Sequence, residues 1–158
     1  MDLPAFLRST EVIRTIRPYC HQHVVDFIEV VLAAGPTPLK VETLANRLRV
    51  HRRALEQRLA GAGGPRPIQL IAWCRLLKAA DLLEQDNWTV ESIAEACGYC
   101  SAGALRKAAI RRRLPIRRLR TERGFATAVL SFAEALRLSR EAHRACKKVR
   151  RNRGSDDK

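Results

Sequence analysis

Apolar residues recur at helical spacing along most of the chain, and Gly, Pro or short polar residues separate the apolar stretches. The best-defined stretch covers residues 89–113. Thr89 and Ser101 are each placed to cap a helix, and Gly98 lies between the two helices where the chain must turn sharply. Two short helices across a tight turn are typical of a helix-turn-helix unit. The pattern therefore predicts an all-α fold that contains such a unit.

The two faces of these helices differ in chemistry. Ile93, Ala94 and Cys97 form an apolar face on the first helix, and Leu105 and Ala109 do so on the second. A basic second helix is suited to enter the major groove of DNA. The basic face of the second helix consists of Arg106, Lys107, Arg111, Arg112 and Arg113.

The apolar pattern of this unit occurs a second time, about fifty residues earlier. The offset is 49 residues from Ala45 to Ala94 and 50 residues from Leu55 to Leu105, which predicts one extra residue in the second turn. The chain therefore holds two copies of one helix-turn-helix unit. The other matching pairs are Leu44 with Ile93, Leu48 with Cys97, Val50 with Tyr99 and Leu59 with Ala109.

The segments outside the two units also show helical patterns. Two helices are expected over residues 4–17 and 19–34, separated at Pro18, and a long helix that packs on both units is expected to begin at Pro67. Residues 146–158 are expected to be disordered or to become ordered only on DNA. One apolar face of a C-terminal amphipathic helix is formed by Phe125, Val129, Phe132 and Leu136.

The predicted organisation is two helix-turn-helix subdomains joined by a long linker helix, with extra helices at both ends. Its segments are an N-terminal helical extension (1–38), the first helix-turn-helix (39–63), the linker helix (64–88), the second helix-turn-helix (89–123), and a C-terminal helix with a basic tail (124–158).

The chain is strongly basic, with 30 Lys and Arg against 16 Asp and Glu and a net charge of +14, which is typical of proteins that bind nucleic acid. Aromatic residues make up only 5% of the sequence and are not interleaved with basic ones, which favours duplex DNA over single strands. A basic helix lying on anionic lipid would account for the charge but not for the predicted turns. The first 36 residues are net acidic and are expected to support the fold or contact a partner.

Other functional classes find little support in the sequence. The five cysteines have unrelated spacings, and neither a leader nor an apolar run of about 20 residues is recognisable, so we expect a cytoplasmic protein without a membrane span. Zinc at Cys97 and Cys100 would need two more ligands, and the inward position of Cys97 predicts a packing role. His21 and His23 are expected at the surface. No catalytic constellation is recognisable, so we expect a non-enzyme without a cofactor.

Several motifs are shared with one known family. Residues 45–50 read A-x-x-L-x-V, residues 54–59 read A-L-x-x-x-L, and residues 93–101 read I-A-E-A-C-G-Y-x-S. Together with the linker helix at 67–83, these motifs resemble the DNA-binding domain of the AraC/XylS family of bacterial transcription regulators. The resemblance covers about residues 24–120. It implies a short, stand-alone regulator or a DNA-binding subunit controlled by a partner, since the chain lacks the length for the ligand-binding domain that many members add.

The chain departs from the family pattern at three turn and cap positions. His51 stands where Ser often caps the first recognition helix, and Arg49 occupies a turn position where Gly would be easiest. The Gly that normally ends the second recognition helix is absent from RRRLPIRRLR at 111–120.

The resemblance implies base-contacting positions on both recognition helices. Arg can contact guanine, Gln can contact adenine, and Glu can accept from cytosine, so the chemistry of the first helix agrees with this role. A solvated helix face, on which Glu56 only balances Arg52 or Arg53, is the alternative. The second helix is expected to contribute less base discrimination, because Ala102 and Gly103 lack contacting groups. The implied base-contacting residues are Arg52, Arg53, Glu56 and Gln57 in the first unit and Gly103, Arg106 and Lys107 in the second.

The other basic residues near the recognition helices are assigned to phosphates. Recognition helices in successive major grooves must lie about 34 Å apart, so a shorter linker favours DNA bending. The assigned phosphate contacts are Arg58, Arg111, Arg112, Arg113, Arg117, Arg118 and Arg120.

The expected function is that of a sequence-specific regulator at the nucleoid, which acts with RNA polymerase or a second regulator. Its oligomeric state is left open. The alternative is a structural nucleoid protein with little sequence preference.

Overall fold

The structure, a computed structural model, describes residues 8–35 and 39–153. All regular elements within these ranges are helical, which confirms the predicted all-α fold. The elements are α1 (Ser9–Ile16), the 3₁₀ turn η1 (Arg17–Tyr19), α2 (Gln22–Ala33), α3 (Val41–Arg47), α4 (Arg52–Gly61), α5 (Pro67–Glu84), α6 (Val90–Ala96), α7 (Ala102–Arg111), α8 (Ile116–Leu119) and α9 (Gly124–Arg153).

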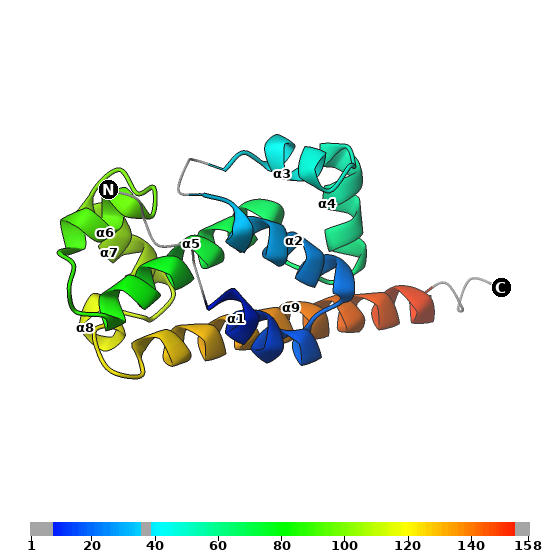
Figure 1. Cartoon of the computed structure of the whole chain (residues 1–158). Helices are drawn as coiled ribbons and strands as arrows, with labels where there is room; N and C mark the ends of the chain where they lie inside the picture. The colour runs from blue at the N-terminus through cyan, green and yellow to red at the C-terminus, as the bar shows by residue number, and fades with distance from the viewer. Residues whose placement is uncertain (1–7, 36–38, 154–158) are drawn as a thin grey trace.

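Helix α5 lies between the two helical units. Figure 1 shows α3 and α4 at one end of the molecule, α6, α7 and α8 at the other, and α9 running along both. Helix α5 contacts α2, α6, α7, α8 and α9, and Leu70, Leu76 and Leu77 along it are buried. The long linker helix therefore packs on the second unit, as expected, but is linked to the first through α2, which contacts α3 and α4. All of them share one continuous core. Ile68, by contrast, is 68% exposed despite its place in the apolar pattern.

The turns of the two units have the same hydrogen-bond pattern. Val50 N donates to Ala45 O at 3.0 Å in the first, and Tyr99 N donates to Ala94 O at 2.8 Å in the second. Arg49 (φ 55°) and Gly98 (φ 75°) hold the left-handed position. The second turn has one residue more before its recognition helix begins, as the sequence offsets predict.

The recognition helices α4 and α7 also end alike. Gly64 N donates to Leu59 O at 2.9 Å after α4, and Leu114 N donates to Ala109 O at 3.0 Å after α7. Arg113 (φ 57°) takes the left-handed position that a glycine fills in the first unit. Both helices are 10 residues long, so the missing glycine does not change the helix length.

The predicted caps are present in the second unit. Thr89 Oγ1 accepts from Ser92 N at 3.1 Å, and Ser101 Oγ accepts from Ala104 N at 3.1 Å. His51 makes no side-chain cap at the start of α4. The second recognition helix therefore begins at a firmer cap than the first.

The second N-terminal helix begins later than the sequence predicts, at Gln22 and not at Tyr19. Pro18 lies in the 3₁₀ turn η1, and the extended backbone of Cys20 (φ −140°, ψ 162°) separates that turn from α2. His21 then caps α2, since its Nδ1 accepts from His23 N at 3.1 Å. Both histidines are exposed, as expected. Residues 4–7 of the first expected helix lie outside the described residues.

The expectation of disorder after residue 145 is wrong for residues 146–153, which are the last two turns of α9. No Gly or Pro interrupts the chain between Phe125 and Arg153, and the last turns are rich in Lys and Arg, which favour helix. The predicted apolar face is confirmed upstream, where all four of its residues are buried: Phe125, Val129, Phe132 and Leu136. The rest of the expected tail, residues 154–158, lies outside the described residues.

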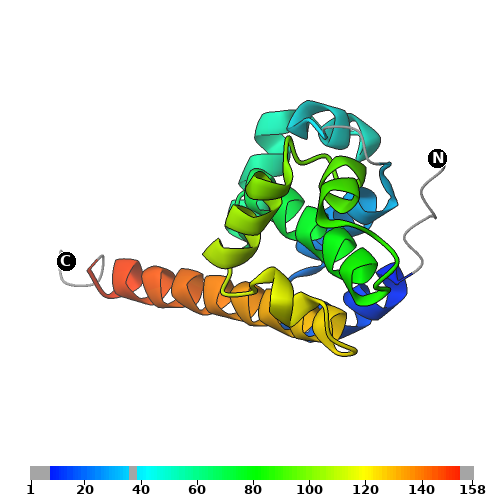
Figure 2. The same cartoon turned by 90° about the vertical axis from the view of Figure 1, so that its left-hand side faces the viewer.

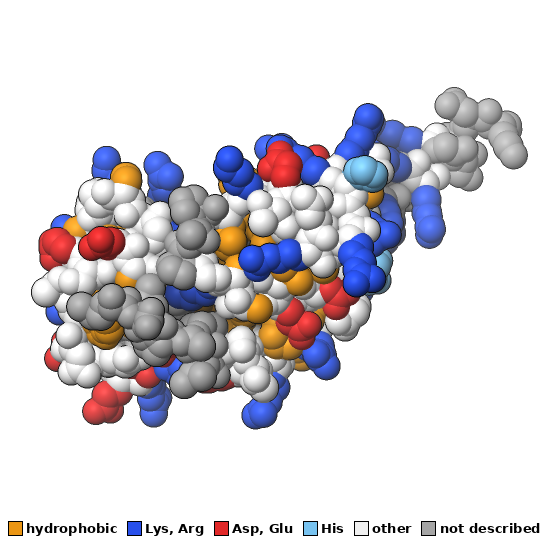
Figure 3. Space-filling model, turned by 45° about the horizontal axis from the view of Figure 1, so that its top comes forward, with side chains coloured by type: hydrophobic (Ala, Val, Ile, Leu, Met, Phe, Trp, Pro, Cys, Tyr) orange, Lys and Arg blue, Asp and Glu red, His pale blue; other side chains and the backbone are white. Residues whose placement is uncertain are grey.

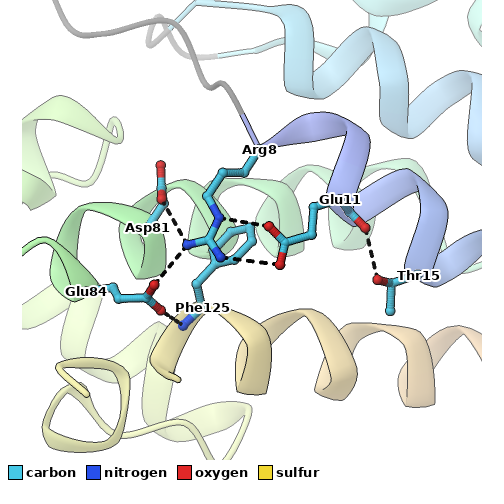
Figure 4. A network of polar contacts seen from close by, with 6 residues as sticks. All are labelled: Arg8, Glu11, Thr15, Asp81, Glu84 and Phe125. Atoms are coloured by element: carbon cyan, nitrogen blue, oxygen red, sulfur yellow. Dashed lines mark hydrogen bonds and ion pairs between the residues drawn. The ribbon is translucent and has the colours of Figure 1, made fainter. Parts of the chain in front are cut away.

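Arg8 joins α1, α5 and α9 (Figure 4). Its guanidinium donates to Glu84 Oε1 at 3.0 Å and lies 3.7 Å from the centre of the Phe125 ring. The other oxygen of Glu84 accepts from Phe125 N at 2.8 Å, which satisfies a free donor at the start of α9. Glu11 and Asp81 complete the contacts of Arg8, and burial raises the pKa of Asp81. This cluster fixes the start of α9 against α5.

Arg49→Gly is expected to raise the free energy of unfolding by about 1 kcal/mol. A left-handed conformation is costly for an L-residue, and glycine relieves this cost despite its greater entropy loss. The matched control is Arg58→Gly in the middle of α4, which should lower the same free energy by about 1 kcal/mol. Urea unfolding followed by circular dichroism measures both. A loss of stability in both variants would contradict the role of the turn geometry.

Candidate nucleic-acid interface

The recognition helices are held by one face and leave the opposite face exposed. Leu55 and Leu59 of α4 and Leu105 and Ala109 of α7 are buried, as the repeat predicts. The outward positions of both helices carry mainly polar and basic side chains, although Gly103 and Ile110 of α7 are exposed as well. Figure 3 shows that Lys and Arg gather at the end of the molecule where α4 and the last turns of α9 lie.

In the first unit, Arg53 and Gln57 are exposed on the same face of α4, four residues apart. Neither side chain has a hydrogen bond or ion pair with the part of the protein that the structure describes. Arg52 differs, because its guanidinium binds Glu42 of α3 and, at 2.9 Å, Glu56 of its own helix. A hydrogen bond with its own backbone and the Arg52 guanidinium lower the pKa of Glu42. Arg53 and Gln57 are therefore the freer groups.

The second unit repeats the contact between a carboxylate and an arginine. Glu91 Oε1 of α6 lies 3.8 Å from Arg106 Nη2 of α7. Gly103 and Lys107 are exposed, and Lys107 has no polar partner among residues 8–35 and 39–153. Each unit thus has a glutamate of its first helix beside an arginine of its recognition helix, although the two arginines do not occupy equivalent positions.

Sequence reasoning missed the role of Glu42 and Glu91. A signal for it is present, because a Val-Glu pair occurs at 41–42 and again at 90–91, with the same 49-residue offset that relates Ala45 to Ala94. Both glutamates also suit the positive end of their helices. Because this local role already accounts for both glutamates, the sequence alone does not point to their contacts across the turn.

The arginines assigned to phosphates fall into two groups. Arg112 and Arg120 are bound within the protein, and the others are exposed without a polar side-chain partner in the described ranges. Arg120 donates to Trp88 O at 2.8 Å and lies 3.8 Å from Asp86. The exposed group is Arg58, Arg111, Arg113, Arg117 and Arg118.

Arg112 is packed inward between α7 and α5. Its guanidinium lies 5.0 Å from the Trp73 ring centre and donates to Ala108 O at 3.2 Å. Trp73 in turn stacks on Phe132 of α9, with 5.2 Å between the ring centres. Burial lowers the pKa of Arg112. The side chain thus holds the recognition helix on the linker helix, a role that its position in a run of arginines conceals.

The two cysteines of the second turn lie in different environments. Cys97 is buried, which confirms its predicted packing role, and Cys100 is exposed. Within the described ranges, no group of three or more His, Cys, Asp or Glu is placed to hold a metal ion. No helix there is long and apolar enough to span a membrane.

Comparison with known proteins identifies a region that spans most of both units. Residues 44–114 match a family model described as a helix-turn-helix domain, which covers α4, α5, α6 and α7 and the end of α3. The matched region contains every residue assigned to base contacts. No curated protein and no solved structure matches the chain.

Glu42→Gln is expected to increase affinity for random duplex DNA. The change removes a negative charge and frees Arg52 for a phosphate, so the slope of log affinity against log salt should become steeper by about 0.9. Fluorescence anisotropy over a salt series measures this slope. Glu29→Gln is the matched control, because it removes the same charge from α2, where Glu29 lies beside Arg17 of η1. Equal effects of the two variants would contradict a specific restraint on Arg52.

Proposed function

We propose that this protein is a sequence-specific transcription regulator, which binds DNA through residues 44–114, the region that matches a helix-turn-helix family model and resembles the AraC-type domain. It places α4 and α7 in successive major grooves of double-stranded DNA. The observation that carries the proposal is the joining of two like units by one buried helix, with the exposed face of each recognition helix left polar and basic. Such a face suits base edges and phosphates together.

The first unit supplies most of the base discrimination in this proposal. Arg53 is suited to guanine and Gln57 to adenine, and both are free of other polar contacts. Arg52 and Glu56 form one ion pair, so they contact bases only when that pair opens. In the second unit Lys107 is the free group, Arg106 is restrained by Glu91, and Gly103 allows close approach of the backbone.

The exposed arginines around α7 and α8 supply phosphate affinity. Arg111, Arg113, Arg117 and Arg118 are exposed beside the second recognition helix, and Arg58 is exposed on the first. Arg112 and Arg120 reach phosphates less readily, because each is bound within the protein. The second unit therefore anchors the complex, while the first selects the sequence.

One chain covers an asymmetric site without dimerising, because it already contains two recognition helices. The resemblance to AraC-type regulators further supports action with RNA polymerase or a second regulator at the nucleoid. Helices α1 and α2 belong to the net acidic N-terminal segment and pack on α9 and α5 respectively. The exposed side of these helices is the part of the chain best suited to such a protein partner.

Competition binding tests sequence specificity. Fragments that the protein binds are first selected from a random duplex library, and gel shifts at physiological salt then compare the best fragment with excess random duplex. We expect a specificity ratio above about 10³, because a regulator must find its site among many others. A smaller ratio would favour a structural nucleoid protein that coats or bends DNA.

Substitutions on α4 test the assigned base contacts. Arg53→Ala or Gln57→Ala should weaken binding to the best site by about 1 to 3 kcal/mol and relax base choice at one position. Arg117→Ala should weaken all sequences alike and reduce the salt slope by about one. Binding is measured on the best fragment, its single-base variants and random duplex. Equal losses on the best fragment and on random duplex for Arg53→Ala would contradict the base contact.

A further inference from the structure

Helix α9 continues well beyond the part that packs on the core. Its buried residues end at Leu136, and two residues beyond Leu136 contact the turn that follows α4. There Ser139 Oγ donates to Gly63 O at 2.9 Å, and the ring of His143 packs so closely that a Cβ on Gly63 would lie 3.1 Å from His143 Cβ. The ten residues after His143 are all exposed and extend the helix by about 15 Å. Figures 1 and 2 show this part projecting from the body.

This distal part of α9, residues 140–153, is densely basic. It has one acidic residue, Glu141, whose carboxylate is already bound by Arg137 at 2.6 Å. From Arg144 onward no side chain forms an ion pair with the described protein. A cost of self-repulsion remains until a polyanion binds. The seven basic side chains are Arg140, Arg144, Lys147, Lys148, Arg150, Arg151 and Arg153.

The charges of the distal part are arranged in a stripe. Arg140, Arg144, Lys147 and Arg151 follow the spacing i, i+4, i+7 and i+11, which places them on one face of the helix. Leu138, Ala142, Ala145 and Val149 follow the same spacing on another face. This second stripe is too small to hold a second copy of the chain, because two of its four residues are alanine and pairing would bring the basic helices together. The charge therefore favours a negatively charged partner.

The contact of Ser139 and His143 with Gly63 determines which polyanion lies nearest to the distal part of α9. It holds the projecting helix beside the C-terminal end of α4, the recognition helix that carries Arg53 and Gln57. Helices α4 and α7 lie at opposite ends of the molecule, and the distal part leaves at the end where α4 lies (Figure 1). DNA bound to α4 would pass close to the basic stripe.

We propose that the distal part of α9 is a third DNA-contacting element, which binds the phosphate backbone on the outer side of the site occupied by α4. This inference rests on the proposed function, since it takes the DNA to be held by α4 and α7. Lysine and arginine side chains on a helix outside the groove add affinity without base discrimination. The protein therefore covers more duplex than its two recognition helices span.

A charge-matched pair of variants tests the contact. Lys147→Gln with Arg151→Gln should reduce the salt slope by about two and weaken the best site and random duplex alike, by about tenfold at physiological salt. Arg14→Gln with Arg17→Gln removes the same charge from the N-terminal segment and should leave the slope nearly unchanged. Equal changes in the two double variants would overturn the inference. So would a distal variant that keeps its DNA binding and loses only binding to phosphatidylserine vesicles. Unchanged thermal unfolding of both would exclude a folding defect.

Cys146 offers a second test that does not depend on affinity. Of the five cysteines only Cys100 and Cys146 are exposed, so Cys100→Ser leaves one accessible thiol for an iron chelate that cleaves nearby DNA. We expect cuts in the flank beyond the α4 site. Cys146→Ser labelled at Cys100 should cut at the α7 site. Cuts from Cys100 without cuts from Cys146 would overturn the inference and leave the proposed function standing, whereas no localised cuts from either position would overturn both.

Discussion

The buried length of α5 is the constraint on which the rest of the structure depends. It packs against α6 and α7 of the second unit and against α2, which in turn contacts α3 and α4 of the first. Its half-buried Lys78 donates to Ala34 O at 2.7 Å, which ties it to the end of α2. On the opposite side, Trp73 lies between Arg112 and Phe132. The positions of α4 and α7 relative to each other therefore depend on α5 together with α2, which links α5 to the first unit.

The basic residues fall into two classes, according to whether their side chains have partners within the protein. A minority have partners within the protein, and these contacts determine geometry: Arg8 fixes the start of α9, Arg120 binds Trp88 O, and Glu42 restrains Arg52. The majority are exposed without partners in the described ranges and account for most of the net charge. Because exposed ion pairs contribute little to stability, the chain can leave so many cations uncompensated and still fold.

Much of this architecture is predictable from the sequence, because buried positions obey helical spacing and the caps and turns have strong residue preferences. Thr89, Ser101 and Gly98 behave as their chemistry predicts. Contacts between distant segments are harder to predict from the sequence. Nothing in the arginine run distinguishes the inward-packed Arg112 from its neighbours, since only the position of Trp73 in space decides it. The helical state of residues 146–153 was missed because charge density suggested disorder, whereas a helix already stabilised upstream propagates easily through good helix formers. The assigned base contacts remain predictions.

The extra residue in the second turn has a consequence for DNA. The two units differ by this one residue and occur in a fixed order along one chain, so the two ends of the protein are not equivalent. On a duplex it would bind with polarity, and inverting its site would exchange the flanks on which α8 and the end of α9 lie. A promoter could thus use the orientation of a single site, and not only its position, to decide which side of the protein faces the transcription start.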